Sequence, residues 1–125
     1  GGFPITEMLD ADTIEKLVQR TRSGGGEIVN LLKTGSAFFA PGASSAKMVE
    51  AIIRDEKRLL PASAYLRGEY GYEGFFLGVP VFLGGNGVEE IVEIDLSENQ
   101  KEALKVSADH VAEGVKNLET FYSPG

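Results

Sequence analysis

The chain has 125 residues, enough for a single domain over residues 1–125 with a modest core. Its formal net charge of −7 and its 12 scattered basic residues argue against nucleic acid and anionic membranes as partners, because both would repel it. It contains no cysteine, which excludes disulfides, thiolate metal sites and a cysteine nucleophile and suits a reducing, cytoplasmic setting.

The amino-terminal part is predicted to be helical. A first helix is expected from Asp12, which Glu15 would help to cap, to about Lys33. Its apolar stripe continues across three consecutive glycines, Gly24 to Gly26, although each glycine inside a helix costs about 0.8–1 kcal/mol relative to alanine. The glycines therefore predict that another helix or a small ligand comes unusually close to the bare backbone.

A second helix is expected from about Ser36 to Arg54, and its first half consists almost entirely of small residues. Pro41 lacks an N–H group, so it marks an early turn or a kink of this helix. Small residues at a helix start permit either close helix packing or contact with a planar ligand. From the residues alone, packing is the favoured interpretation.

Beyond Lys57 the pattern changes to that of β-strands. Residues 59–66 and 75–83 read as strands joined by a longer connection, and the apolar run 75–83 is too short to span a bilayer. Gly84 to Gly87 is expected to supply the positive-φ residues of a tight turn before a third strand, residues 88–94. Strands joined in this way should be antiparallel.

The last predicted element is a long helix. Ser97 and Gln100 form a capping box at its start. One apolar face follows, made of Leu104, Ala108, Val111, Val115 and Leu118. Two consecutive helices, antiparallel strands and a long carboxy-terminal helix together predict an α+β fold rather than a doubly wound one.

Few residues offer catalytic chemistry by themselves. His110 is the only histidine, and because Asp109 and Glu113 flank it on a face expected to be wet, a solvated surface role is favoured over that of a base. Neither glycine run has the order of strand, spaced glycines and helix that a dinucleotide fingerprint needs. The sequence therefore predicts no nucleotide site and no catalytic base of its own.

The remaining charged residues favour structural or solvated roles. A metal site or a carboxylate pair could be suggested by Asp10, Asp12, Glu89, Glu90 and Glu93, but their spacing follows caps and strand alternation, and no histidine stands near them. Carboxylate clamps could be suggested by Arg20, Arg22, Arg54, Arg58 and Arg67. Surface ion pairs are the favoured use of all five arginines.

Several segments, taken in order, resemble one enzyme family. They are Gly2-Phe-Pro-Ile-Thr-Glu-Met, Arg20-Thr-Arg, Gly24-Gly-Gly-Glu-Ile-Val, Gly35-Ser-Ala with Pro41, Leu60-Pro-Ala, Tyr65-Leu-Arg-Gly-Glu-Tyr-Gly, Gly78-Val-Pro-Val and Leu83-Gly-Gly-Asn-Gly-Val-Glu. Together they resemble the malate dehydrogenases of the lactate-dehydrogenase-like branch, and specifically their carboxy-terminal, substrate-binding domain. The resemblance covers nearly the whole chain.

The resemblance implies positions for the active site. Ser36 and Ala37 would lie beside the substrate, Pro41 against the nicotinamide ring, and Gly25 and Gly26 along the pocket wall nearby. Lactate dehydrogenases usually have threonine where Ala37 stands and isoleucine where Pro41 stands, so both residues point to malate rather than lactate.

The resemblance places the catalytic base outside this chain. The family's catalytic histidine belongs to a Gly-Gly-His-Gly-Asp motif, which is expected just before Gly1. No catalytic residue is therefore expected on this chain. NAD would be bound mainly by an amino-terminal Rossmann domain that is also absent from it, so the chain alone is expected to be inactive.

The resemblance also implies a function, the NAD-dependent interconversion of L-malate and oxaloacetate in the tricarboxylic acid cycle. The chain would supply one wall of the active site and subunit contacts in a homo-oligomer, a dimer or tetramer, with helices around Gly24–Gly26 and Leu104–Leu118 as the contacts. The alternatives are a non-catalytic assembly module or remnant fragment, or a domain of a lactate or other 2-hydroxy-acid dehydrogenase.

Overall fold

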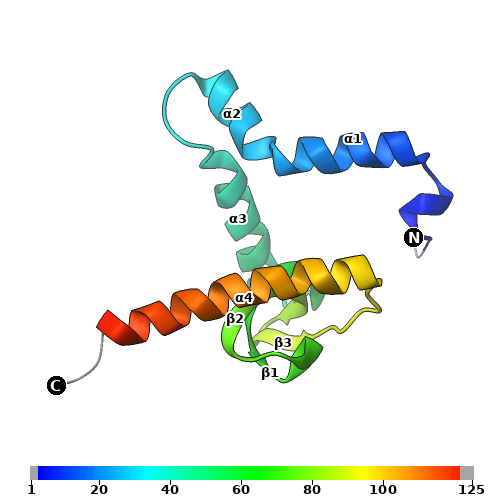
Figure 1. Ribbon diagram of the computed structural model, residues 1–125. Coiled ribbons are helices and arrows are strands. Elements are labelled where there is room, and N and C mark those ends of the chain that lie inside the picture. Colours follow the sequence, from blue (N-terminus) through cyan, green and yellow to red (C-terminus); the bar gives the residue numbers. More distant parts are fainter. Residues whose placement is uncertain (1–2, 122–125) are drawn as a thin grey trace. The chain divides into compact units, whose positions relative to one another are not determined.

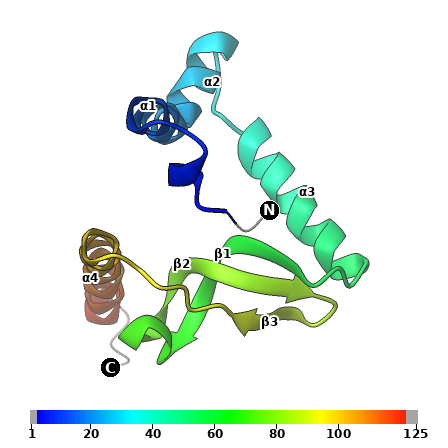
Figure 2. The same cartoon turned by 90° about the vertical axis from the view of Figure 1, so that its right-hand side faces the viewer.

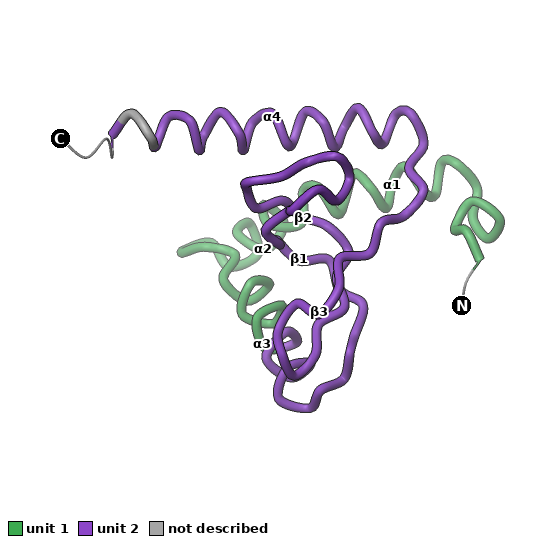
Figure 3. Tube along the Cα trace, turned by 90° about the horizontal axis from the view of Figure 1, so that it is seen from below, with its two compact units in different colours: residues 1–46 green, residues 47–125 purple. Residues whose placement is uncertain are grey.

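The computed structural model of the chain describes residues 3–121, with the backbone alone at positions 119 and 120. Gly2 of the first motif lies outside the described residues, and so does Gly1, the residue before which the histidine motif is expected. Internal contacts divide the chain into two compact units, residues 1–46 and residues 47–125 (Figure 3). The expected single domain over residues 1–125 stays a prediction. None of the described helices is both long and apolar enough to cross a membrane.

The first unit is helical (Figure 1). The short helix η1 (Ile5–Glu7) is followed by α1 (Ala11–Arg22) and α2 (Gly24–Leu32), and α3 (Phe39–Ile53) begins in this unit and ends in the second. Asp10 caps α1, accepting hydrogen bonds from the backbone N and Oγ1 of Thr13, both at 2.8 Å. The predicted cap at Asp12 is therefore wrong, because the extended backbone that a capping residue needs occurs at Asp10.

The predicted continuous helix across the glycines is also wrong. The chain bends at Ser23, whose φ of −92° and ψ of 0° end α1, and Gly24 to Gly26 form the first turn of α2 rather than a helix interior (Figure 1). Apart from the neighbouring backbone of the same helix, no atom lies within 4 Å of the place where a Cβ would stand on any of the three glycines. Among the described residues, then, no other helix makes the close approach that the glycines led us to expect.

A salt bridge spans the bend between α1 and α2. Arg20 donates from Nε to Oε2 of Glu27 at 3.1 Å and from Nη2 to Oε1 of Glu27 at 2.8 Å. The guanidinium therefore binds both carboxylate oxygens, as a bidentate pair. The hydrogen bonds and the positive charge of Arg20 hold the pKa of Glu27 below its usual value of 4.5. The pair joins residues seven positions apart, which a straight helix would place two turns from each other.

This pair should make the helical signal of the chain sensitive to acid. Because the pKa of Glu27 is lowered in the folded state, its stabilising contribution is present above the unfolded value near 4.5 and is lost as the pH falls through the lower folded pKa. We expect circular dichroism at 222 nm to fall more steeply on acidification below pH 4.5 in the wild type than in Glu27→Gln. Glu15→Gln, which alters only a contact to Gln19, is the control. If the circular dichroism signal of the wild type and that of Glu27→Gln fell equally below pH 4.5, this role of the salt bridge would be contradicted.

The second unit is built around a three-stranded sheet with the order β1-β2-β3. Its strands are β1 (Arg58–Arg67), β2 (Glu73–Gly84) and β3 (Gly87–Ile91), and both pairs are antiparallel, as predicted. The third strand ends at Ile91 rather than at Ile94. Beyond it, the carbonyl of Val92 and the amide of Ile94 are bonded to the side chain of Tyr70 instead of to a neighbouring strand.

The turn between β2 and β3 is held from outside the hairpin. The run Gly84–Gly87 forms the expected tight turn, and within it Gly87 alone has a positive φ (+87°). The register shifts by one residue next to it, a combination typical of a hairpin that carries a bulge. Asp55, just after α3, accepts a hydrogen bond from the amide of Gly85 at 2.7 Å and so fixes the turn to the end of that helix.

The core lies between the sheet and α4 (Glu98–Phe121), which crosses β2 (Figures 1 and 2). Alternate residues of β1 and β2 are buried with Ala108 of α4, namely Ala62, Ala64, Leu66, Leu77, Val79 and Val81. One of the two hydrogen bonds of the predicted capping box is seen, since Gln100 Oε1 accepts from the amide of Ser97 at 2.9 Å, and the Ser97 hydroxyl donates to the same oxygen at 3.0 Å. Leu104 and Val111 pack on the core, whereas Leu118, farther along the predicted apolar face, is 57% exposed.

Gly84 should be the glycine of this turn that tolerates a side chain least. A Cβ there would lie 2.7 Å from Oε1 of Glu89 and 2.9 Å from Oδ1 of Asp55, and hydrogen bonds to Asn86 and Gly85 hold both carboxylates in place. We expect Gly84→Ala to lower the free energy of unfolding by about 1–2 kcal/mol, the worth of one or two such bonds.

The matched control for Gly84→Ala is Gly114→Ala in α4, where no atom lies within 4 Å of the new Cβ. That change should instead raise the free energy of unfolding, by up to about 1 kcal/mol, because alanine is the better helix former. Urea denaturation measures both variants. Equal free energies of unfolding for Gly84→Ala and the wild type would contradict this prediction, because the carboxylates of Glu89 and Asp55 would then move aside without loss of stability.

Candidate functional site

The predicted substrate and cofactor positions lie in the loop between α2 and α3 and in the first turn of α3. Lys33 (φ 65°) and Gly35 (φ 86°) reverse the chain there, so that the start of α3 returns toward the start of α2 (Figures 1 and 2). Ser36 is exposed and Ala37 is half-buried. The helix begins at Phe39 rather than at Ser36, because the left-handed residues keep the preceding backbone out of the helix.

Pro41 is the third residue of α3 and is exposed. At that position the missing N–H costs nothing, since the first turn of a helix has no partner for it. The helical bond from the amide of Gly42 to the carbonyl of Phe38, at 2.9 Å, starts directly after it. Of the two alternatives, Pro41 therefore marks an early turn and not a kink.

Gly25 and Gly26 belong to the first turn of α2, and both are exposed. Gly26 borders a shallow hollow of about 510 Å³ on α2. The other residues that line it are Ser23, Glu27, Asn30, Leu31 and Lys33. The structure thus brings Ser36, Ala37 and Pro41 together along the chain, and the hollow at Gly26 does not include them.

The surroundings of these positions are open and apolar. Phe38 and Phe39, which follow Ala37, stack with ring centroids 4.5 Å apart and are 56% and 60% exposed. None of residues 3–46 is buried. A site that excludes water needs walls on several sides, so the predicted positions form one side of a site at most.

The other residues singled out by their chemistry occupy surface positions. His110 is exposed on α4. Arg20, Arg54 and Arg58 form ion pairs with Glu27, Glu50 and Glu56 at 2.8, 2.7 and 2.9 Å, as expected of surface arginines. Among the side chains of residues 3–118 and 121, no three histidine or acidic groups lie close enough to hold a metal ion.

The expected position of the catalytic histidine, before Gly1, falls outside both the sequence and the described residues. That position therefore stays a prediction. The exposure of His110 on α4 agrees with the surface role that the sequence favoured for it.

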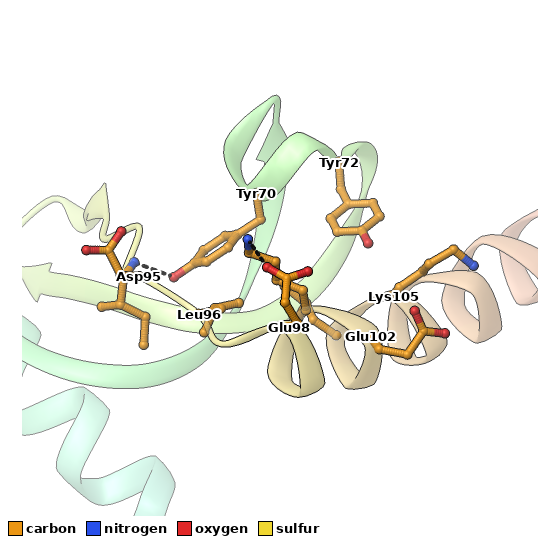
Figure 4. A pocket seen from close by; sticks show the side chains of 10 residues that line it. Tyr70, Tyr72, Asp95, Leu96, Glu98, Glu102 and Lys105 are labelled. Atoms are coloured by element: carbon orange, nitrogen blue, oxygen red, sulfur yellow. Dashed lines mark hydrogen bonds and ion pairs between the residues drawn. The ribbon is translucent and has the colours of Figure 1, made fainter. Parts of the chain in front are cut away.

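A second hollow, of about 480 Å³, lies in the second unit between the η2 turn (Glu69–Gly71) and the start of α4 (Figure 4). Tyr70 and Tyr72 reach into it from the turn, and Leu96 and Leu104 add apolar surface. Lys101 on its rim pairs with Glu98 at 2.8 Å, and Lys105 pairs with Asp109 at 2.9 Å. Asp95 and Glu102 also line the hollow, so three carboxylates and two lysines leave it with little net charge.

Tyr70, which lines that hollow, makes three hydrogen bonds to the segment between β3 and α4. Its backbone is left-handed (φ 54°, ψ 14°), an unfavourable conformation for a bulky residue, and its amide donates to Oε1 of Glu93 at 2.6 Å. Its hydroxyl donates to the carbonyl of Val92 at 2.7 Å. The same hydroxyl accepts from the amide of Ile94 at 3.1 Å, the bond drawn as a dashed line from the Tyr70 hydroxyl in Figure 4. Tyr70 thus ties the segment between β3 and α4 to the η2 turn.

Removing the hydroxyl should loosen this segment. We expect Tyr70→Phe to lower the free energy of unfolding by about 1–2 kcal/mol, because the carbonyl of Val92 and the amide of Ile94 both lose their partner. Faster hydrogen exchange at Ile94 should accompany the loss. The control is Tyr72→Phe, whose hydroxyl makes neither bond. Equal effects of the two substitutions would show that the hydrogen bonds of Tyr70 contribute nothing specific.

Comparisons with known proteins decide the family. The sequence model of the lactate/malate dehydrogenase, alpha/beta C-terminal domain matches residues 3–122. The chain belongs to this family. It is 55% identical over 119 residues to the malate dehydrogenase of Geobacillus thermodenitrificans, and 53% identical over 118 residues to that of Methanosarcina mazei. These alignments cover 95% and 94% of the chain but only 38% of either relative.

Solved structures agree with the fold. The malate dehydrogenase of Salinibacter ruber superposes with a TM-score of 0.87 at 49% identity, and the lactate dehydrogenase of Eimeria maxima, solved with NADH and oxamate, also gives 0.87, at 38% identity. Each match covers 98% of this chain and 40% of the other. The predicted α+β fold and the resemblance to the carboxy-terminal domain of malate dehydrogenases are thereby confirmed.

Sequence reasoning gave no role to Tyr70 or to the Phe38–Phe39 pair. A signal was present for Tyr70, which stands between Gly68 and Gly71 in a connection rich in glycine. A tyrosine within a tight glycine turn suggests a side chain that closes the turn by hydrogen bonds. No comparable pattern identifies its partners, Val92 and Ile94, because they lie more than 20 residues away along the chain.

Proposed function

We propose that this family member acts as part of an NAD-dependent malate dehydrogenase that interconverts L-malate and oxaloacetate. In this proposal Ser36 and Ala37 contact the substrate, Pro41 faces the nicotinamide ring, and Gly25 and Gly26 belong to the wall nearby. The observation that carries it is the 55% identity to a malate dehydrogenase over 95% of the chain. The chain spans 38% of that relative's length, so the rest of the site, including the catalytic histidine, is proposed to come from the part it does not span.

Two residues support malate over lactate. Ala37 has only a methyl group where the resemblance places a threonine in lactate dehydrogenases, which leaves more room for a four-carbon dicarboxylate than for a three-carbon acid. Pro41 replaces an isoleucine. The fold does not discriminate, since a malate and a lactate dehydrogenase give the same TM-score of 0.87, but identity is higher to the malate enzyme, at 49% against 38%.

The residues of this chain fit only one part of an NAD site, the contact with the nicotinamide ring. Pro41 is exposed in the first turn of α3, and the neighbouring Ala40 and Gly42 are small, so a planar ring can approach this surface. When bound, NAD supplies the hydride acceptor for oxidation of the hydroxy acid. Neither glycine run forms a phosphate cradle, because Gly84–Gly87 turns a hairpin and Gly24–Gly26 follows a helix. We propose that most of the NAD contacts come from outside this chain.

We also propose a cytoplasmic setting and a homo-oligomer. The support for the first is the absence of cysteine, which suits a reducing compartment. The support for the second is the apolar surface of residues 3–46, which includes Phe3, Met8, Leu31, Phe38 and Phe39, all more than half exposed. Surface of this kind is normally covered by other protein.

Complementation tests the proposed activity. The chain is mixed during refolding with the amino-terminal part of the Geobacillus thermodenitrificans enzyme that the alignment leaves uncovered, and oxaloacetate-dependent oxidation of NADH is followed at 340 nm. We expect no turnover from either part alone, since hydride transfer requires both reactants and a base to be held together. The mixture should show turnover with oxaloacetate that exceeds turnover with pyruvate.

Site variants sharpen the result. Pro41→Asp should abolish turnover of the mixture by placing a charge against the proposed ring, whereas His110→Ala, altering an exposed residue of α4, should leave it unchanged. Turnover by the chain alone, or its loss in His110→Ala with the fold intact, would overturn the assignment of roles. A preference for pyruvate over oxaloacetate would favour a lactate dehydrogenase.

A further inference from the structure

The turn between β2 and β3 contains the only asparagine of the chain that is followed by glycine, in the dipeptide Asn86-Gly87. Asn30, Asn99 and Asn117 are followed by leucine, glutamine and leucine instead. Asparagine is a thermolabile residue, because the backbone nitrogen of the next residue can attack its side-chain carbonyl carbon. Glycine has no Cβ to hinder that attack. Asn86-Gly87 is therefore the dipeptide of this chain in which deamidation is sterically easiest.

The turn itself requires the glycine that makes this dipeptide labile. Gly87 has a φ of +87°, in the left-handed region that residues with a side chain rarely adopt. Beyond its chain neighbours, no atom lies within 4 Å of the place where a Cβ of Gly87 would stand. The bulged hairpin thus keeps a glycine after Asn86 and leaves open space beside it.

The side chain of Asn86 is exposed and weakly held. Its Nδ2 donates to Oε1 of Glu89 at 3.2 Å, the long end of the range for such bonds, and it has no second hydrogen-bond partner among the residues that the structure describes. The backbone amide of Asn86 reaches the same oxygen at 3.4 Å. Water therefore has access to this side chain, and its Cγ can turn toward the backbone nitrogen of Gly87.

We propose that Asn86 is a site of spontaneous deamidation, with water as the only co-reactant. The backbone nitrogen of Gly87 loses its proton and forms a bond to Cγ of Asn86, the bond from Cγ to Nδ2 breaks, and Nδ2 leaves as ammonia after taking up a proton. One water molecule then opens the cyclic imide. Opening at Cγ gives aspartate, and opening at the backbone carbonyl carbon gives isoaspartate, whose main chain runs through Cγ. This inference does not depend on the catalytic function proposed above.

The new carboxylate changes the electrostatics of the turn. An oxygen replaces the Nδ2 that donated to Oε1 of Glu89, so two carboxylates face each other across the former bond of 3.2 Å. A third carboxylate, that of Asp55, binds the amide of Gly85 at 2.7 Å, while the nearby Lys57 lies 3.8 Å from Oε2 of Glu89. A negative charge added beside acidic residues disrupts local structure by repulsion. Deamidation therefore weakens the bond by which Asp55 fixes the turn to the end of α3.

Ageing of the purified chain tests the modification. Peptides that carry each asparagine are weighed by mass spectrometry, because the exchange of an amide NH₂ for a hydroxyl raises the mass by about one dalton. We expect Asn86 to be modified at least about tenfold faster than Asn30, Asn99 or Asn117, since it alone precedes glycine, and to yield both aspartate and isoaspartate. Equal rates at the four positions, or aspartate without isoaspartate, would overturn the proposal.

Charge substitution tests the effect on the turn. Asn86→Asp should lower the urea midpoint and speed hydrogen exchange at the amide of Gly85 about fivefold, the worth of one hydrogen bond. Asn99→Asp adds the same charge at an exposed position in the first turn of α4, where a helix favours it, and should do neither. Deamidated wild type, separated by ion exchange, should match Asn86→Asp. Equal midpoints and equal exchange at Gly85 in Asn86→Asp and Asn99→Asp would contradict the effect.

Discussion

The register of β1 against β2 is the constraint on which the second unit depends. Ala62 opposite Val79 and Ala64 opposite Leu77 place every buried side chain of the two strands on the side of α4. Because side chains alternate along a strand, a slip of one residue would turn these residues outward and bring Tyr65 and Phe76 against the helix. The small alanines, together with Ala108, let α4 lie close to the sheet, and larger residues there would force it away.

The first unit shows the opposite situation. Its helices have sound local reasons to form, such as the Asp10 cap and the Arg20–Glu27 pair, yet none of residues 3–46 is buried. The chain spans 38% of the length of the Geobacillus thermodenitrificans relative, so in that relative further protein is available to cover a surface of this kind. The proposed substrate positions Ser36, Ala37 and Pro41 belong to this open unit, so the proposed chemistry and the well-formed core occupy different units.

Much of the fold was predictable because its signals are local. The existence of the three strands and their antiparallel pairing followed from patterns a few residues long and were confirmed, and one hydrogen bond of the Ser97–Gln100 capping box is seen. The helix across Gly24–Gly26 failed because a periodic apolar stripe does not reveal a bend at one serine. The third strand was predicted three residues too long because its end depends on Tyr70, more than 20 residues away. The candidate site came from the family resemblance rather than from residue chemistry, and its roles stay a prediction.

The sequence by itself determined the family and most of the element types and their order, since periodicity, turn residues and distinctive motifs are all properties of neighbouring positions. It also determined that His110 stands on a polar stretch of the last helix. Only the tertiary structure decided that Asp55 holds the β2–β3 turn and that Tyr70 closes the segment before α4. These features join residues that are far apart along the chain, and a contact of that kind exists only once the chain has folded.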